Sequence, residues 1–119
     1  MNNSFDYLMS KFLLDYSEND NDNKNLEIYE GEDISKEFRK ILDKIAVEII
    51  YDTFENEELI SAVLSLNRVE RIIVVFGLIL GMSNMEVAFL VNTNMNSIYV
   101  QKCKAIRKLK KYIIENDIF

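Results

Sequence analysis

Two short polar motifs, sixteen residues apart, fix where helices begin in the second half of this chain. They read NRVE at 67–70 and SNME at 83–86, so each places an Asn or Ser three residues before a Glu. In such a capping box the first side chain accepts the third residue's amide, and the Glu returns a bond to the first amide. The helix that starts at the first motif must therefore end near Leu80, and Gly81 suits the left-handed position after it.

The rest of the chain also predicts helices. It has no proline, only three glycines and 49% hydrophobic residues, which favours long helices around a modest core. Apolar residues recur at helical spacing over 5–16, over 33–54 after a cap at Asp33, and over a short segment ending near Leu66. We therefore predict an all-α fold of about five or six helices, with a polar linker at 17–25. The core stripe predicted for the middle helix comprises Ile34, Phe38, Ile41, Leu42, Ile45, Ile49 and Phe54.

Charge divides the 119 residues into two parts of opposite sign. Residues 1–58 hold 16 acidic and 6 basic side chains (−10), whereas residues 59–119 hold 4 acidic and 8 basic ones (+4), which together give the net charge of −6. We predict an acidic helical part at 1–58 that binds a partner or regulates, and a part at 59–119 that faces nucleic acid. The basic cluster of the second part comprises Lys102, Lys104, Arg107, Lys108, Lys110 and Lys111.

Several function classes are excluded by what the sequence lacks. There is no histidine and a single cysteine, Cys103, so the chain can form no internal disulfide, His-based metal site or His-containing catalytic triad. It has no phosphate-binding loop and no pair of carboxylates in an apolar setting, and we expect neither enzymatic activity nor a cofactor. The acidic N-terminus has no signal-peptide pattern, and the longest apolar run, at 72–80, is nine residues. We expect a cytoplasmic protein without a membrane partner.

The stretch 84–112 has the spacing of a helix-turn-helix rather than of one interrupted surface helix. Its first helix ends near Val91, and Asn92 follows where the turn needs a positive φ angle. Ala88 is small enough for the helices to cross closely, and Asn94 is a suitable cap for the second helix. The inward face predicted for the second helix comprises Ile98, Ala105, Ile106 and Leu109.

A helix placed in this way presents its first two turns to the major groove of DNA. Asn96 suits adenine edges, and Tyr99 or Val100 suits thymine methyls, so we predict an AT-rich target. If about four phosphates are neutralised, log affinity should fall with log salt at a slope of roughly −3.6. The outward residues predicted there are Met95, Asn96, Ser97, Tyr99, Val100 and Lys102. The predicted DNA-binding set is completed by the helix starts at Ser83, Asn84 and Asn94 and by the flanking Lys104, Arg107 and Lys108.

The second half of the chain contains a correlated set of residues: Leu66, Glu70, Arg71, the aliphatic run 72–80, GMS at 81–83, EVA at 86–88, Val91, Asn92, Ile98, Ala105, Ile106 and Leu109. With this set, residues 59–112 resemble region 4 of the sigma-70 family of RNA polymerase factors. The resemblance implies a regulator of transcription that binds double-stranded DNA together with core RNA polymerase, with the apolar segment 72–80 and Met82 near the polymerase. The segments FDYL and ENEELISAVLSL further resemble small sigma-like regulators encoded on conjugative elements of low-GC bacteria.

The sequence departs from this family at the recognition helix, which often carries Arg or Lys in its first two turns. No cation precedes Lys102 there, and Gln101 and Lys102 stand where an apolar residue is expected. The acidic first part has no Trp and does not resemble a complete promoter-melting region, so melting would fall to another, second sigma-like protein. The alternative is an interaction protein that does not bind DNA: a decoy for a sigma factor or polymerase, or a helical dimer.

Overall fold

The computed structural model describes residues 5–16 and 36–116. These residues contain no strand, which confirms the predicted all-α fold. The predicted cap at Asp33 and the linker at 17–25 lie outside them. The helices are α1 (Phe5–Asp15), α2 (Lys36–Thr53), α3 (Glu57–Leu64), α4 (Arg68–Ile72), the π-helix η1 (Ile73–Ile79), α5 (Asn84–Leu90) and α6 (Met95–Glu115).

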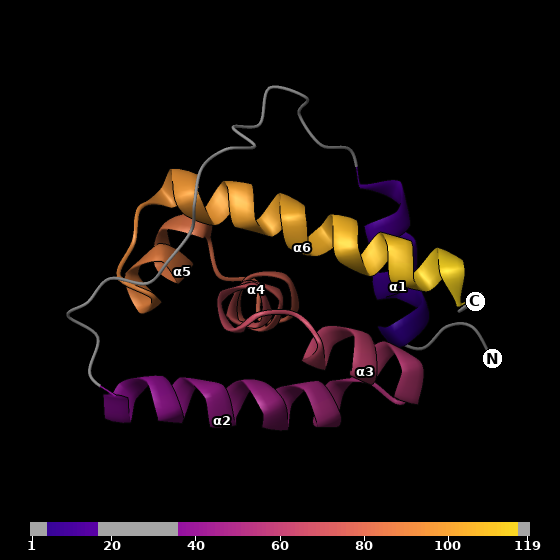
Figure 1. Cartoon of the computed structure of the whole chain (residues 1–119), viewed down its shortest axis with the longest axis horizontal. Helices are drawn as coiled ribbons and strands as arrows, with labels where there is room; N and C mark the ends of the chain where they lie inside the picture. Colours follow the sequence, from indigo (N-terminus) through magenta and orange to yellow (C-terminus); the bar gives the residue numbers. More distant parts are fainter. Residues whose placement is uncertain (1–4, 17–35, 117–119) are drawn as a thin grey trace.

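The helices α4 and η1 run on from each other and form the centre of the fold. Figure 1 shows this central helix nearly end on, between α2 and α6, with α5 beside one end of α6 and α1 crossing the other. One hydrophobic core joins Leu13 of α1 and Leu42 of α2 to Ile106 of α6. The predicted boundary between residues 58 and 59 falls inside α3. The described residues of the two predicted parts therefore pack as one folded unit, whatever separate roles the parts have.

Both ends of the central helix lie where the capping rules place them. The Asn67 side chain accepts the Glu70 amide at 2.9 Å, and the Glu70 carboxylate accepts the Asn67 amide at 3.0 Å. Gly81 has a φ of 78°, the left-handed conformation that ends a helix. The interior differs from an ordinary α-helix, since the amide of Leu80 bonds to the carbonyl of Val75, five residues back. No described helix, this one included, has the length and apolarity needed to span a membrane.

The core stripe of α2 differs from the predicted one. The residues that face the core are Leu42, Ala46 and Ile50, at steps of four, whereas Phe38, Ile41 and Ile45 are exposed. The predicted stripe contained only large side chains and left out Ala46, which is buried. A small residue at such a position suits a close approach of two helices. An apolar flank of α2 therefore remains on the surface.

The helix α1 is held against the rest of the fold by a buried carboxylate. Oδ2 of Asp6 accepts the backbone amides of Glu55 at 2.9 Å and Asn56 at 2.8 Å, at the start of α3. At the other end of α1, Nζ of Lys110 donates to the carbonyl oxygen of Tyr16 at 3.0 Å. Asp6 thus acts on α3 as a capping side chain does, but from 49 residues away along the chain.

Candidate nucleic-acid interface

The turn between α5 and α6 has the conformation that the sequence predicts. Asn92 has a φ of 52°, and it is the one non-glycine residue among those described with a positive φ. The amide of Thr93 donates to the carbonyl of Ala88 at 2.9 Å, and the amide of Asn92 donates to the carbonyl of Phe89 at 3.3 Å. This pair of bonds, with a left-handed residue between the helices, ends α5 as a Schellman motif and redirects the chain into α6.

Replacing Asn92 by Val is expected to lower the free energy of unfolding by about 1–2 kcal/mol, because a left-handed backbone crowds a β-branched side chain. Asn92→Gly should be nearly neutral, since glycine has no Cβ. Urea unfolding followed by circular dichroism measures both effects. The matched control is Asn96→Val, which makes the same change at an exposed position of a right-handed helix. Equal losses at the two positions would contradict the argument.

At the start of α5 the amide of Ser83, one of those that the sequence analysis assigned to phosphate, is already bonded within the chain. The hydroxyl of Ser83 accepts the Glu86 amide at 3.1 Å, and the Glu86 carboxylate accepts the Ser83 amide at 2.8 Å. Hydrogen bonds from the backbone and then the side chain of Ser83 hold the pKa of Glu86 below its usual value. An ionised carboxylate therefore stands where a phosphate at Ser83 and Asn84 was predicted, and it would repel that phosphate.

The side of α6 that begins at the exposed Asn96 is defined here as the groove-facing side: Asn96, Tyr99, Val100 and Cys103, at helical steps of three, four and seven. Tyr99 and Cys103 border the core side, since they lie about 20° and 60° around the helix from the core residue Ile106, whereas Val100 lies about half a turn from Leu109. Asn96 is exposed and Tyr99 is half-buried. Val100 and Cys103 are buried, with 3% and 1% of their surfaces exposed. The groove-facing side is thus open at its leading turn and closed further along.

The predicted outward residues divide into two groups. Met95 and Asn96 at the leading turn are exposed, and Lys102 is half-buried. The prediction that Ser97 and Val100 face outward is wrong in this structure, because both are buried. The start of α6 itself is as predicted, since the side chain of Asn94 accepts the Ser97 amide at 2.7 Å.

Gln101 is buried where the family pattern expects an apolar residue. Its position on the inward face agrees with the spacing from Ile98, which is fully buried in the core. The register of α6 therefore follows the helix-turn-helix spacing even where the residue type does not.

The cations of α6 are spread around the helix rather than gathered on one side. Arg107 is exposed and lies about 40° around the helix from Cys103. Lys102 and Lys104 are half-buried and lie about 100° from Cys103, on opposite sides of it. Lys108 lies about 140° away and turns toward the central helix. Measured from Val100, Lys104 lies about 40° around the helix and Lys102 about 160°, so Arg107 and Lys104 are the best placed of the predicted phosphate contacts.

Lys108 is bound to the chain's own carboxylate. Its Nζ lies 2.7 Å from Oε2 and 2.9 Å from Oε1 of Glu70, whose side chain is buried. Glu70 therefore has two roles: it closes the capping box of α4 and it anchors α6 to the central helix. Lys108 was predicted to contact phosphate, and in this structure its ammonium neutralises the buried acid instead. The sequence analysis assigned Glu70 only a cap, since nothing in the local pattern connects it to a residue 38 positions away.

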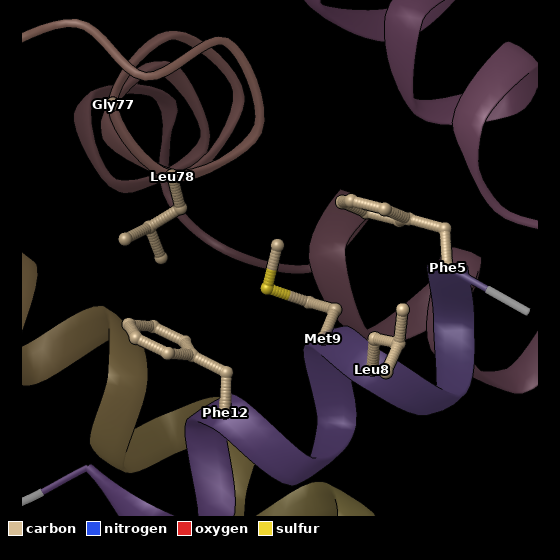
Figure 2. A pocket seen from close by; sticks show the side chains of 6 residues that line it. All are labelled: Phe5, Leu8, Met9, Phe12, Gly77 and Leu78. Carbon is tan, nitrogen blue, oxygen red and sulfur yellow. The ribbon is translucent and has the colours of Figure 1, made fainter. Parts of the chain in front are cut away.

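Two exposed apolar features lie outside the groove-facing side. Met85 and Phe89 of α5 are one helical turn apart on the surface, and Phe89 is 85% exposed. A pocket with a volume of about 280 Å³ lies between α1 and η1. Figure 2 shows Phe5, Leu8, Met9 and Phe12 of α1 around this pocket, facing Leu78 and Gly77 of η1. Both features suit apolar side chains of another protein better than they suit a phosphate backbone.

The arrangement as a whole is a helix-turn-helix in which the groove-facing side of the second helix is open at its leading turn and buried at Val100 and Cys103. Asn96 is exposed at that turn, and Lys104 and Arg107 follow the buried Cys103 along the helix. Comparisons of this chain with protein-family models, with curated proteins and with solved structures found no match.

Proposed function

We propose that this chain is a sigma-like DNA-binding regulator of transcription that acts with RNA polymerase and lacks a promoter-melting region of its own. The observation that carries the DNA part is the turn at Asn92, whose φ of 52° separates α5 from a second helix with an exposed leading turn. The resemblance of residues 59–112 to sigma-70 region 4 supports the promoter and polymerase part. In this proposal the protein performs no chemistry on its partners.

Recognition of DNA would then begin at the leading turn of α6. Asn96 is exposed there, and an Asn side chain bonds adenine through two hydrogen bonds in the major groove. Lys104 and Arg107 lie farther along the helix and would neutralise one phosphate each. Base contacts are few in this arrangement, so an AT-rich duplex is the target class that the residues favour.

Affinity for such a duplex is expected to fall with salt at a log–log slope of about −1.8, because two phosphates are neutralised. That slope corresponds to about a tenfold loss between roughly 50 and 200 mM salt. Fluorescence anisotropy with a labelled AT-rich duplex measures the slope. In the double variant Lys104→Gln/Arg107→Gln the affinity should fall, and the slope should become shallower, closer to zero. The matched control is Lys40→Gln/Lys44→Gln, which removes two exposed cations from α2. A control that behaves like the α6 variant, or an absence of binding at every salt concentration, would refute the proposal.

A second candidate function is an interaction protein that does not bind DNA. The stretch 72–101 favours it, because that stretch contains no Lys or Arg and its one charged residue is Glu86. The exposure of Met85 and Phe89 on α5 also favours it, since apolar surface of this kind suits a protein partner. Binding of purified core RNA polymerase or a sigma factor, with no binding of any duplex, would identify this function instead.

A further inference from the structure

The helix α2 carries an apolar stripe on the surface of the fold. The stripe is formed by Phe38, Ile41 and Ile45, which lie within about 60° of one another around the helix. All three side chains are exposed, and 55% of the surface of Ile41 is accessible. Figure 1 shows α2 along one edge of the fold, with the central helix on its inner side. Apolar residues grouped in this way suit contact with another protein surface.

The exposed charges of α2 change sign along the helix. Before Ile45 they are three lysines and one glutamate, which sum to +2, and after it they are two acids, which sum to −2. The chain then has no Lys or Arg before Arg68, so the acidic part continues past the end of α2. The exposed charged residues are Lys36, Glu37, Lys40 and Lys44 in the first part and Glu48 and Asp52 in the second.

This order of charges is the reverse of the one that an isolated helix favours. The helix dipole favours acids at the N-terminus and cations at the C-terminus. Yet α2 begins with Lys36, and its last turn contains Asp52 and no basic residue. A second copy of α2 lying antiparallel would bring opposite charge to each end, whereas a parallel copy would bring like charge.

We propose that two copies of this chain form a dimer in which their α2 helices pack antiparallel through the apolar stripe. Each copy contributes the same surface, as in most homodimers. With the two helices centred near residue 43, Ile41 of one copy lies opposite Ile45 of the other, and Lys40 lies opposite Glu48. The central helix separates α2 from α6 (Figure 1), so this interface does not involve α6 and does not depend on the function proposed above.

The first test is the mass of the native full-length chain in solution. We expect a weak dimer, because one helix offers less surface than the roughly 800 Å² per partner of a typical stable interface. Analytical ultracentrifugation up to about 1 mM chain should therefore show the mass rise to twice that of one chain. Ile41→Ser should raise the dissociation constant at least about tenfold, because the change occurs twice in the dimer. The matched control, Val47→Ser, alters an exposed residue at least about 120° around α2 from the stripe and should leave the dimer intact.

The second test identifies the occupant as another copy of the chain. Lys40→Glu/Lys44→Glu makes both parts of α2 acidic, and Glu48→Lys/Asp52→Lys makes both parts basic, so neither variant should dimerise alone. An equimolar mixture of the two should associate, because each then meets the opposite charge along all of α2. The control Lys11→Glu/Lys111→Glu makes the same change in net charge outside α2 and should dimerise as the native chain does. Circular dichroism and thermal melting show that each variant is folded.

Three results would overturn the inference. A native chain that keeps the mass of one copy at every concentration would mean that the apolar stripe has another occupant. A dimer that Ile41→Ser and Val47→Ser affect equally would lie on another surface. A mixture of the two charge variants that does not associate would show that the two parts of α2 do not meet across the interface.

Discussion

Replacing Lys108 by Met is expected to lower the free energy of unfolding by about 3 kcal/mol, because it leaves a buried carboxylate without its cation. Glu70 would keep the hydrogen bond from the Asn67 amide at 3.0 Å, but it would lose the ammonium that lies within 2.9 Å of both its oxygens. The methylenes of Met preserve the packing of the Lys108 stem, so the change isolates the charge. Urea unfolding measured by circular dichroism gives the value.

The control for this variant is Lys111→Met, which removes an exposed cation from the same helix and should change stability by less than about 0.5 kcal/mol. Adding Glu70→Gln to Lys108→Met should recover much of the loss, since a neutral amide still accepts the Asn67 amide and needs no counter-charge. If Lys108→Met is no more harmful than Lys111→Met, the ion pair does not hold α6 to the central helix.

Replacing Asp6 by Ala is expected to cost about 3 kcal/mol of unfolding free energy, because two backbone amides lose a charged acceptor at once. The amides of Glu55 and Asn56 donate to Oδ2 of Asp6 at 2.9 and 2.8 Å, and they lie where the chain enters α3. The loss should appear in urea unfolding. It should also appear as faster amide exchange along α1, because this carboxylate is one of the bonds that hold α1 in place.

Asp15→Ala is the matched comparison, since Asp15 is an exposed acid of the same helix. It should alter neither the unfolding free energy nor the exchange of α1 by a measurable amount. Asp6→Asn should fall between the two, because its carbonyl oxygen remains an acceptor but carries no charge. A loss with Asp15→Ala as large as that with Asp6→Ala would show that the charge of α1, rather than the two hydrogen bonds, is what matters.

The features that the sequence predicted correctly depend on residues close together in the chain. Examples are the two capping boxes, the left-handed Gly81 and the turn at Asn92. Each involves groups within a few residues of one another, so a short stretch of sequence is enough to predict it. The existence and type of the helices follow from the spacing of apolar residues in the same way. These features place the candidate site on the chain.

The features that the sequence did not predict depend on how helices meet. Glu70 has an ordinary capping pattern, and nothing near it indicates that Lys108 will neutralise it. Asp6 looks like a first-turn acid of α1, yet it serves α3. The side chains of Ser97 and Val100 were expected outside because they lie away from the core stripe of α6, but their burial is a property of the whole fold. Helical spacing identifies the core side of a helix, and it cannot show what covers the opposite side.

The π-helix η1 places wide turns in the segment that leads to the helix-turn-helix. Each of its wide turns spans one residue more than an α-helical turn would, as the bond from Leu80 to Val75 shows. Loss of a single residue between Ile73 and Ile79 would let one wide turn relax to α-helical geometry and would leave the direction of Gly81 nearly unchanged, because the residue lost is the extra one. A one-residue deletion here would therefore leave α5 and α6 facing as they do, whereas the same deletion in an ordinary α-helix would turn everything after it by about 100°.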